Sequence, residues 1–263
     1  MSTAEEWMRI EKYTHPIQGW ASKHELCALF DAAKACTEGA IVEIGSWKGK
    51  STTALGLGSR SGKNITVYAI DPHTGSPDHL AKHAGESIWT FDEFKKNMER
   101  AGLTSLVLPI LDFSDRLAPT WKKPIELLYL DVNYHDYKPG LEDFITWSAF
   151  VVDGGTIALH NPYPSLSVIV KEGQPFHGWP GPRKVLRKLV FGKKGWRNIR
   201  IVDSTVFMQK CAESNPADLI RGRLVQCQGM FLVLLRKLYG LLILLPVPLK
   251  KTFKRIVVSR SKD

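Results

Sequence analysis

The chain has 263 residues, of which 44% are hydrophobic and 24% charged, and its formal net charge is +10 at pH 7. This length and apolar content suit one sizeable domain with appendages, and no repeat of about 20 to 50 residues is present. The four cysteines lack paired spacing, which excludes a disulfide scaffold and a cysteine-based zinc site. The N-terminus has no basic segment followed by an apolar run, so we expect no secretory signal and a cytoplasmic location.

Apolar runs alternate with helix-like segments along most of the chain, which is typical of an α/β fold with a mostly parallel central sheet and helices on both faces. After a leader at residues 1–22, we expect helices at 24–36, 51–57, 90–101 and 140–150. We expect strands at 41–44, 65–70, 106–111, 125–130 and 156–159, the last of them preceded by a turn at 154–155. Residues 23–210 are predicted to form the main domain, and residues 211–263 a helical, apolar and basic tail.

Ionisable side chains follow four of the expected strands, at Asp71, Asp112, Asp131 and His160. In an open α/β sheet, the carboxyl ends of the strands line the crevice that binds the ligand. The sequence therefore predicts a binding site at this edge.

Residues 41–58 read IVEIGSWKGKSTTALGLG, the layout of a strand, a glycine turn and a helix in a Rossmann-like sheet. Three residues separate Gly45 from Gly49, one fewer than a phosphate-binding loop requires, and Trp47 stands where a dinucleotide fingerprint needs glycine. A pyrophosphate ligand is therefore disfavoured. Glu43 would repel phosphate but suits a ligand that carries an ammonium and a sulfonium, such as S-adenosylmethionine. Asp71 would then accept hydrogen bonds from the ribose hydroxyls.

A simpler interpretation of the same segment stays open. The two glycines can serve only to let the strand and the helix pack closely, with Glu43 as a capped carboxylate.

Several motifs occur in an order that resembles a known family. They are GWASKHE at 19–25, VEIGSWKGKST at 42–52, AIDPHTG at 69–75, LLYLD at 127–131, HDY at 135–137, DGGTIALHN at 153–161 and PGPRKVLRKLV at 180–190. Residues 17–190 thus resemble the class I S-adenosylmethionine-dependent methyltransferases of the methyltransferase-24 type, related to macrocin O-methyltransferase and cephalosporin hydroxylase-like proteins. The resemblance implies a Rossmann-like class I methyltransferase fold and O-methyl transfer. It also implies cofactor contacts from Glu43, Gly45, Ser46, Gly49, Ser51, Asp71, Asp112 and Asp131.

The resemblance further implies a divalent metal and a catalytic base. The family's metal ligands match Asp131, His160 and Asn161, of which one is anionic, so Mg²⁺ should bind weakly and Mn²⁺ or Fe²⁺ better. The family's Asp-x-x-His stretch carries one extra residue here. Alignment on the HDY motif makes His135 the general base beside Asp131, since a neutral imidazole accepts a proton near pH 7. A purely structural histidine is the alternative.

The tail carries almost all of the net charge, because residues 219–263 contain 10 Lys/Arg and one acid. Residues 229–249 are strongly apolar but hold Arg236 and Lys237 near their middle, which disfavours a membrane-spanning helix. One expectation is an in-plane helix, with residues 229–262 attracted to an anionic membrane surface at the inner face of the cytoplasmic membrane. The other is a helix packed on the domain or on a second subunit of a homo-oligomer.

The expected acceptor is a hydroxyl of a sugar, a glycan or a small secondary metabolite. Two other function classes stay open. The altered metal and base positions suit a catalytically degenerate protein that still binds S-adenosylmethionine. The basic segment at 183–200 suits a nucleic-acid methyltransferase or binder, although it contains no recognisable reader motif, and we disfavour nucleic acid as a partner.

Overall fold

The computed structural model describes residues 2–75, 88–131, 137–165 and 178–243. Seven strands form a single sheet in the order β3-β2-β1-β4-β5-β7-β6. Their bounds are β1 Ala40–Ile44, β2 Val67–Ile70, β3 Val107–Ile110, β4 Ile125–Leu130, β5 Val151–Leu159, β6 Trp196–Val202 and β7 Thr205–Lys210.

The sheet is mostly parallel, as the sequence predicts. Strand β1 lies in its middle, parallel to β2 and β4, and Ile44 at its end is in register with Ile70 and Leu130. Strand β7 is antiparallel to both β5 and β6. The carboxyl ends of the central strands therefore meet at one edge.

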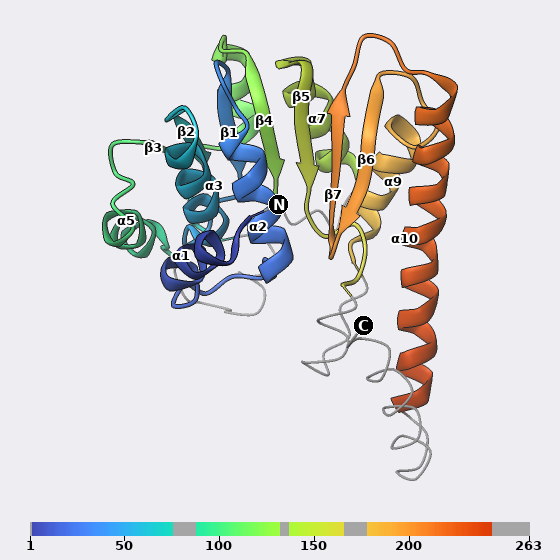
Figure 1. Cartoon of the computed structure of the whole chain (residues 1–263), viewed down its shortest axis with the longest axis horizontal. Coiled ribbons are helices and arrows are strands. Elements are labelled where there is room, and N and C mark those ends of the chain that lie inside the picture. The colour runs from blue at the N-terminus through green and yellow to red at the C-terminus, as the bar shows by residue number, and fades with distance from the viewer. Residues whose placement is uncertain (1, 76–87, 132–136, 166–177, 244–263) are drawn as a thin grey trace.

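Helices cover both faces of the sheet (Figure 1). The bounds are α1 Ala4–Thr14, α2 Lys23–Lys34, α3 Lys50–Ser61, α5 Phe91–Arg100, α6 Ser114–Leu117, the 3₁₀ helix Ala118–Thr120, α7 Tyr137–Ala149, α9 Pro180–Leu189 and α10 Pro216–Ile243. Helices α1, α2, α3 and α5 share one hydrophobic cluster with the sheet. Helices α7 and α9 share the other, which α10 joins beside β6.

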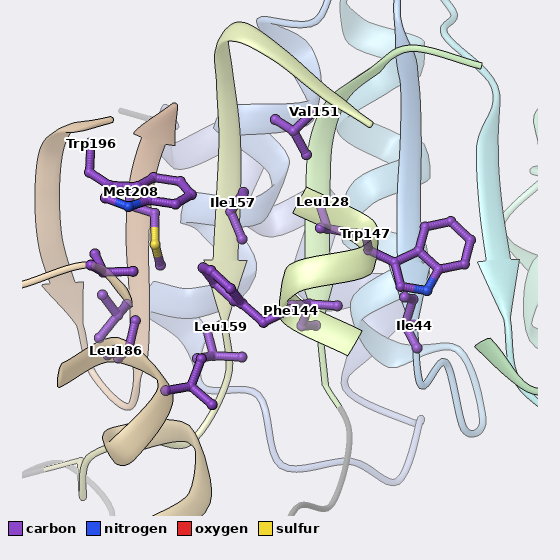
Figure 2. Close-up of a cluster of buried hydrophobic side chains, with 14 of the residues drawn as sticks. Ile44, Leu128, Phe144, Trp147, Val151, Ile157, Leu159, Leu186, Trp196 and Met208 are labelled. Atoms are coloured by element: carbon purple, nitrogen blue, oxygen red, sulfur yellow. The ribbon is translucent and has the colours of Figure 1, made fainter. Parts of the chain in front are cut away.

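The core follows from the alternation of side chains along each strand. In β1, Ile41 enters the cluster under α2 and α3, whereas Val42 and Ile44 enter the cluster under α7. Figure 2 shows the rings of Phe144 and Trp147 reaching from α7 onto this second face. Each buried side chain of this size contributes about 1.5–3 kcal/mol, so both layers hold the sheet in place.

The segment assigned to a leader is part of this domain. Residues 4–14 form α1, which begins with a capping box between Thr3 and Glu6, and Ile10 is fully buried in the cluster with α2 and α3.

Two further features differ from the sequence-based expectation. Gly154 and Gly155 lie inside β5, because the strand starts at Val151, and the register with β4 shifts by a bulge around them. The hairpin of β6 and β7 was not predicted. Its first strand reads WRNIRIV, and its polar residues hide the apolar alternation.

Glycines in α3 let α2 lie close to it. A Cβ at Gly58 would stand 2.3 Å from the carbonyl oxygen of Phe30, whereas a Cβ at Gly56 would meet only side-chain atoms of Leu103 and Val107. We expect Gly58→Ala to lower the free energy of unfolding by about 1–3 kcal/mol, because backbone cannot move aside. Gly56→Ala should cost less, since a side chain can shift and alanine gains about 1 kcal/mol in helix propensity. Urea unfolding would compare the two variants, and equal losses would contradict this packing argument.

Candidate active site

The candidate residues gather where the parallel strands end. Backbone hydrogen bonds extend the ladder one residue past each strand and hold these ends level. They are Gly45 N to Ile70 O at 2.9 Å, Asp71 N to Ile110 O at 3.1 Å, Asp131 N to Ile44 O at 2.9 Å and His160 N to Leu130 O at 3.0 Å. The edge predicted from the sequence therefore exists as one continuous surface of the sheet.

The turn after β1 has a backbone that most residues would not adopt. The φ angles of Gly45, Trp47 and Gly49 are 89°, 47° and 87°. A Cβ at Gly49 would also stand 2.7 Å from Cε of Met98 in α5. The turn is therefore tight, and the backbone N–H groups of Gly45, Trp47 and Gly49 are bonded within the protein, to Ile70, Asp71 and Ser46.

Glu43 lies beneath this turn and is fully buried. Its carboxyl group accepts hydrogen bonds from the hydroxyls of Ser51, at 2.5 Å, and Thr52, both in α3. Burial raises the pKa of Glu43 to about 8, against the two hydroxyl bonds, which lower it. Each oxygen accepts one of these bonds, and full burial keeps both from the surface of the edge, so Glu43 and Ser51 fix the turn from below and the geometry gives Glu43 a positioning role.

Asp71 ties the turn to the next strand. One carboxylate oxygen accepts the backbone N–H of Trp47 at 2.7 Å, and the other accepts that of His73 at 2.6 Å. The side chain is half-buried, and each oxygen keeps a second lone pair. Asp71 can therefore accept further hydrogen bonds from a ligand that enters the edge.

Ser46 offers a second polar contact. Its side chain is only 2% exposed, and its hydroxyl has no hydrogen-bond partner in the described part of the chain. Buried hydroxyls are nearly always paired, so this one suits a ligand group that supplies the missing bond.

Three ionisable side chains, Glu25, Asp131 and His160, form a group at the ends of β4 and β5. Nδ1 of His160 lies 2.6 Å from Oδ1 of Asp131, and Nε2 lies 3.7 Å from Oε1 of Glu25 in α2. Burial lowers the pKa of His160, but the charge and hydrogen bond of Asp131 and the charge of Glu25 outweigh it and raise the pKa to about 9. At neutral pH this imidazole is a cation held between two carboxylates.

The metal ligands implied by the resemblance include Asp131 and His160, and these two engage each other through Oδ1 and Nδ1. Within residues 2–75, 88–131, 137–165 and 178–243, no three His, Cys, Asp or Glu side chains lie close enough to hold a metal ion.

The remaining candidates take different places. Asp112 follows β3 and accepts only the neighbouring N–H of Phe113, at 2.8 Å, among the bonds of the described residues. Asn161 has a left-handed backbone, φ 61°, and its carbonyl accepts the N–H of Trp179. His135 lies outside the described residues.

Glu25 was not predicted as a site residue. Oε2 accepts the backbone N–H of Ser22 in a capping box, while Oε1 accepts the hydroxyls of Ser204 and Thr205 at 2.5 and 2.7 Å. The spacing from Ser22 to Glu25 is a signal for the cap, but the burial comes from a hairpin tip about 180 residues later in the chain.

The comparison with known proteins identifies the domain. Residues 42–162 match a family model described as a methyltransferase domain, of the methyltransferase-24 type. The chain carries a methyltransferase domain. The matched segment runs from β1 to just after β5, so it contains the glycine turn, Asp71, Asp131 and His160.

Solved structures with the same fold include three O-methyltransferases of low sequence identity. TomG from Streptomyces achromogenes, involved in tomaymycin synthesis and solved in complex with S-adenosylmethionine, has a TM-score of 0.53 at 15% identity, over 80% of this chain and 92% of its own. NovP has a TM-score of 0.56 at 15% identity, over 72% and 81% of the two chains. An O-methyltransferase from Bacillus cereus, in complex with S-adenosylhomocysteine, has a TM-score of 0.53 at 15% identity, over 80% of this chain and 92% of its own.

The methyltransferase domain thus has the class I fold of S-adenosylmethionine-dependent methyltransferases, which confirms the fold predicted from the sequence. Its residues fit that cofactor in two ways. The half-buried carboxylate of Asp71 keeps lone pairs for a ligand at the strand ends, and the Ser46 hydroxyl is buried without a partner among the described residues.

The raised pKa of Glu43 leads to a test of its role. Because the folded-state pKa lies above the ordinary value of 4.5, the native methyltransferase binds this proton more tightly than the unfolded chain. The resulting stability is complete below about pH 4.5 and is lost as pH rises through about 8. Glu43→Gln carries no such proton, so the difference in unfolding free energy between wild type and variant should shift in favour of the variant from pH 5 to pH 8.5, measured by urea unfolding.

Glu126→Gln is the matched control. Burial raises the pKa of Glu126, but backbone N–H groups of Glu38, Gly39 and Thr37 outweigh it and lower the pKa below 4.5. The difference in unfolding free energy between Glu126→Gln and the wild type should therefore stay constant from pH 5 to pH 8.5. A constant difference for Glu43→Gln as well would contradict the buried, protonated state of Glu43.

Proposed function

We propose that this protein transfers the methyl group of S-adenosylmethionine to a hydroxyl of a sugar, a glycan or a small secondary metabolite. The observation that carries the proposal is the turn between Gly45 and Gly49 with Asp71 fixed beside it, at the carboxyl edge of a methyltransferase sheet. The names of the structurally similar O-methyltransferases, among them one involved in tomaymycin synthesis, support a hydroxyl acceptor.

The cofactor supplies the chemistry in the form of a methyl group on a positively charged sulfur. The protein's part is placement, because an in-line displacement gains much of its rate from alignment of the two reactants in a water-poor site. In the proposed arrangement, Asp71 accepts the ribose hydroxyls, Ser46 supplies a further polar contact and Asp131 faces the acceptor side. The Asp112 carboxylate, after β3, stays a proposed contact.

The general base is proposed to be His135, and the state of the other histidine at this edge supports the choice. His160 is buried and already carries a proton at neutral pH, since its pKa is raised to about 9. It cannot accept another proton from an acceptor hydroxyl. His135 belongs to the HDY motif directly after β4, and an ordinary imidazole is half-titrated near neutral pH.

Asp71→Asn tests the cofactor contact. The variant keeps an acceptor for the turn but loses the charge that strengthens hydrogen bonds to a ribose, each of which contributes about 1.5–3 kcal/mol. We expect S-adenosylmethionine to bind about 10- to 100-fold more weakly by calorimetric titration. Asp115→Asn, an exposed carboxylate that bonds only the N–H of Arg116 among the described contacts, is the control and should bind as the wild type does. Unchanged affinity in Asp71→Asn would remove Asp71 from the site.

His135→Ala tests the base. A general base contributes about 10²- to 10⁴-fold to turnover, so kcat should fall by that factor while the affinity for S-adenosylmethionine stays unchanged. His15→Ala, at an exposed position after α1, should leave both quantities unchanged. Loss of cofactor affinity in His135→Ala would contradict the assignment.

A panel of hydroxyl acceptors tests the reaction class. Methylated product from macrolide sugars, free glycans or phenolic metabolites, detected by mass spectrometry, would support O-methyl transfer. Binding of S-adenosylmethionine without product from any acceptor would favour the degenerate binding protein instead.

A further inference from the structure

Helix α10 packs on the domain through one side only. The buried residues on this side recur at helical spacing, and they are Gly222, Val225, Gly229, Leu232 and Arg236. The two glycines bring the helix close: a Cβ at Gly229 would stand 2.3 Å from the ring of Tyr163, and one at Gly222 3.0 Å from the backbone nitrogen of Gly192. This side of the helix therefore packs on the domain.

The opposite side of α10 exposes a continuous apolar stripe. It consists of residues whose spacing alternates between four and three, namely Ile220, Leu224, Cys227, Phe231, Leu234 and Leu238. The five large hydrophobic members are between 47% and 64% exposed. At about 1.5 Å per residue the stripe is about 27 Å long. In Figure 1, α10 lies at the edge of the domain, and no described helix or strand is drawn on its outer side. An exposed apolar surface of this length marks an interaction site.

The charge around the stripe is almost entirely positive. Helix α10 contains four cations and a single acid, Asp218 in its first turn. Arg221, Arg223 and Lys237 are exposed, whereas Arg236 lies on the buried side. No carboxylate of the described residues forms an ion pair with any of the four cations. The sequence after the helix adds six further cations and one acid, at its last residue. The surface therefore complements an anionic partner.

A second copy of the chain fits this surface poorly. Two such helices side by side would bring Arg223 and Lys237 near the same cations of the other copy, without acids to pair with them. An anionic bilayer surface fits both properties at once, because acyl chains accept the stripe and phosphate groups accept the cations along its border. No helix in the described part of the chain is long and apolar enough to cross a bilayer.

We propose that α10 binds in the plane of an anionic membrane surface, with the stripe from Ile220 to Leu238 inserted at the boundary between headgroups and acyl chains. The helix extends past the carboxyl ends of the parallel strands (Figure 1). Membrane binding would thus hold the edge with Asp71 and Asp131 near lipid. The proposal does not depend on the identity of the acceptor.

The test is sedimentation of the full chain with vesicles. The chain should bind vesicles of equal parts phosphatidylcholine and phosphatidylglycerol, and bind phosphatidylcholine vesicles at least about tenfold more weakly. The double variant Phe231→Asp, Leu234→Asp should lose at least about tenfold in affinity for the anionic vesicles. The double variant Met8→Asp, Ile145→Asp is the matched control, because Met8 on α1 and Ile145 on α7 are 62% and 52% exposed and the same two negative charges are added on other surfaces. It should bind as the wild type does.

Circular dichroism and affinity for S-adenosylmethionine would verify that the variants are folded. If the double aspartate variant is unfolded, the uncharged double variant Leu224→Gln, Phe231→Gln takes its place in the comparison. Absence of vesicle binding, or equal binding by wild type and stripe variants, would overturn the proposal. A wild-type dimer that becomes monomeric in the stripe variants, without vesicle binding, would assign the stripe to self-association and also overturn it. Lost vesicle binding with intact cofactor binding would separate this proposal from the proposed function.

Discussion

The architecture of the site depends on the carboxylate of Asp71, which accepts backbone N–H groups from the turn after β1 and from its own loop after β2. The left-handed backbone of Trp47 is costly to hold, and a charged acceptor for its N–H group compensates for that cost. Glu43 works from the opposite side, through the hydroxyls of Ser51 and Thr52. Two carboxyl groups on neighbouring strands thus fix one turn, and the fixed turn is what a cofactor can meet without reorganisation.

Charge is arranged differently on the other half of the edge. Isolated charges are expensive in a protein interior, and His160 avoids this penalty by lying between Asp131 and Glu25. The oxygens of Glu25 in turn accept hydrogen bonds from the backbone N–H of Ser22 and the hydroxyls of Ser204 and Thr205. Asp131 and His160, two of the residues that the resemblance implied as metal ligands, are therefore paired with each other.

The sequence predicted the parts of this structure that depend on local pattern. Residues 125–130 form β4 as expected, because a continuous apolar run signals a strand buried on both faces. The ionisable residues after β2, β4 and β5 came together because parallel strands end at one edge. The burial of Glu25 and the charge of His160 could not be predicted, since they depend on partners far away in the chain. Gly154 and Gly155 were assigned to a turn because a bulge inside a strand uses the same residues as a turn.

The hairpin tip that contacts Glu25 has a consequence for biosynthesis. The hydroxyls that bind Glu25 belong to Ser204 and Thr205, which are synthesised much later than α2. A chain emerging from the ribosome can therefore form α2, β1 and the glycine turn before the carboxylate of Glu25 acquires these hydrogen bonds. Until then, the imidazole of His160 lacks one wall of its enclosure. Closure of the last hairpin is therefore the step that completes the surroundings of Glu25 during synthesis, and in nascent chains truncated before residue 205 this carboxylate would lack its hydroxyl partners.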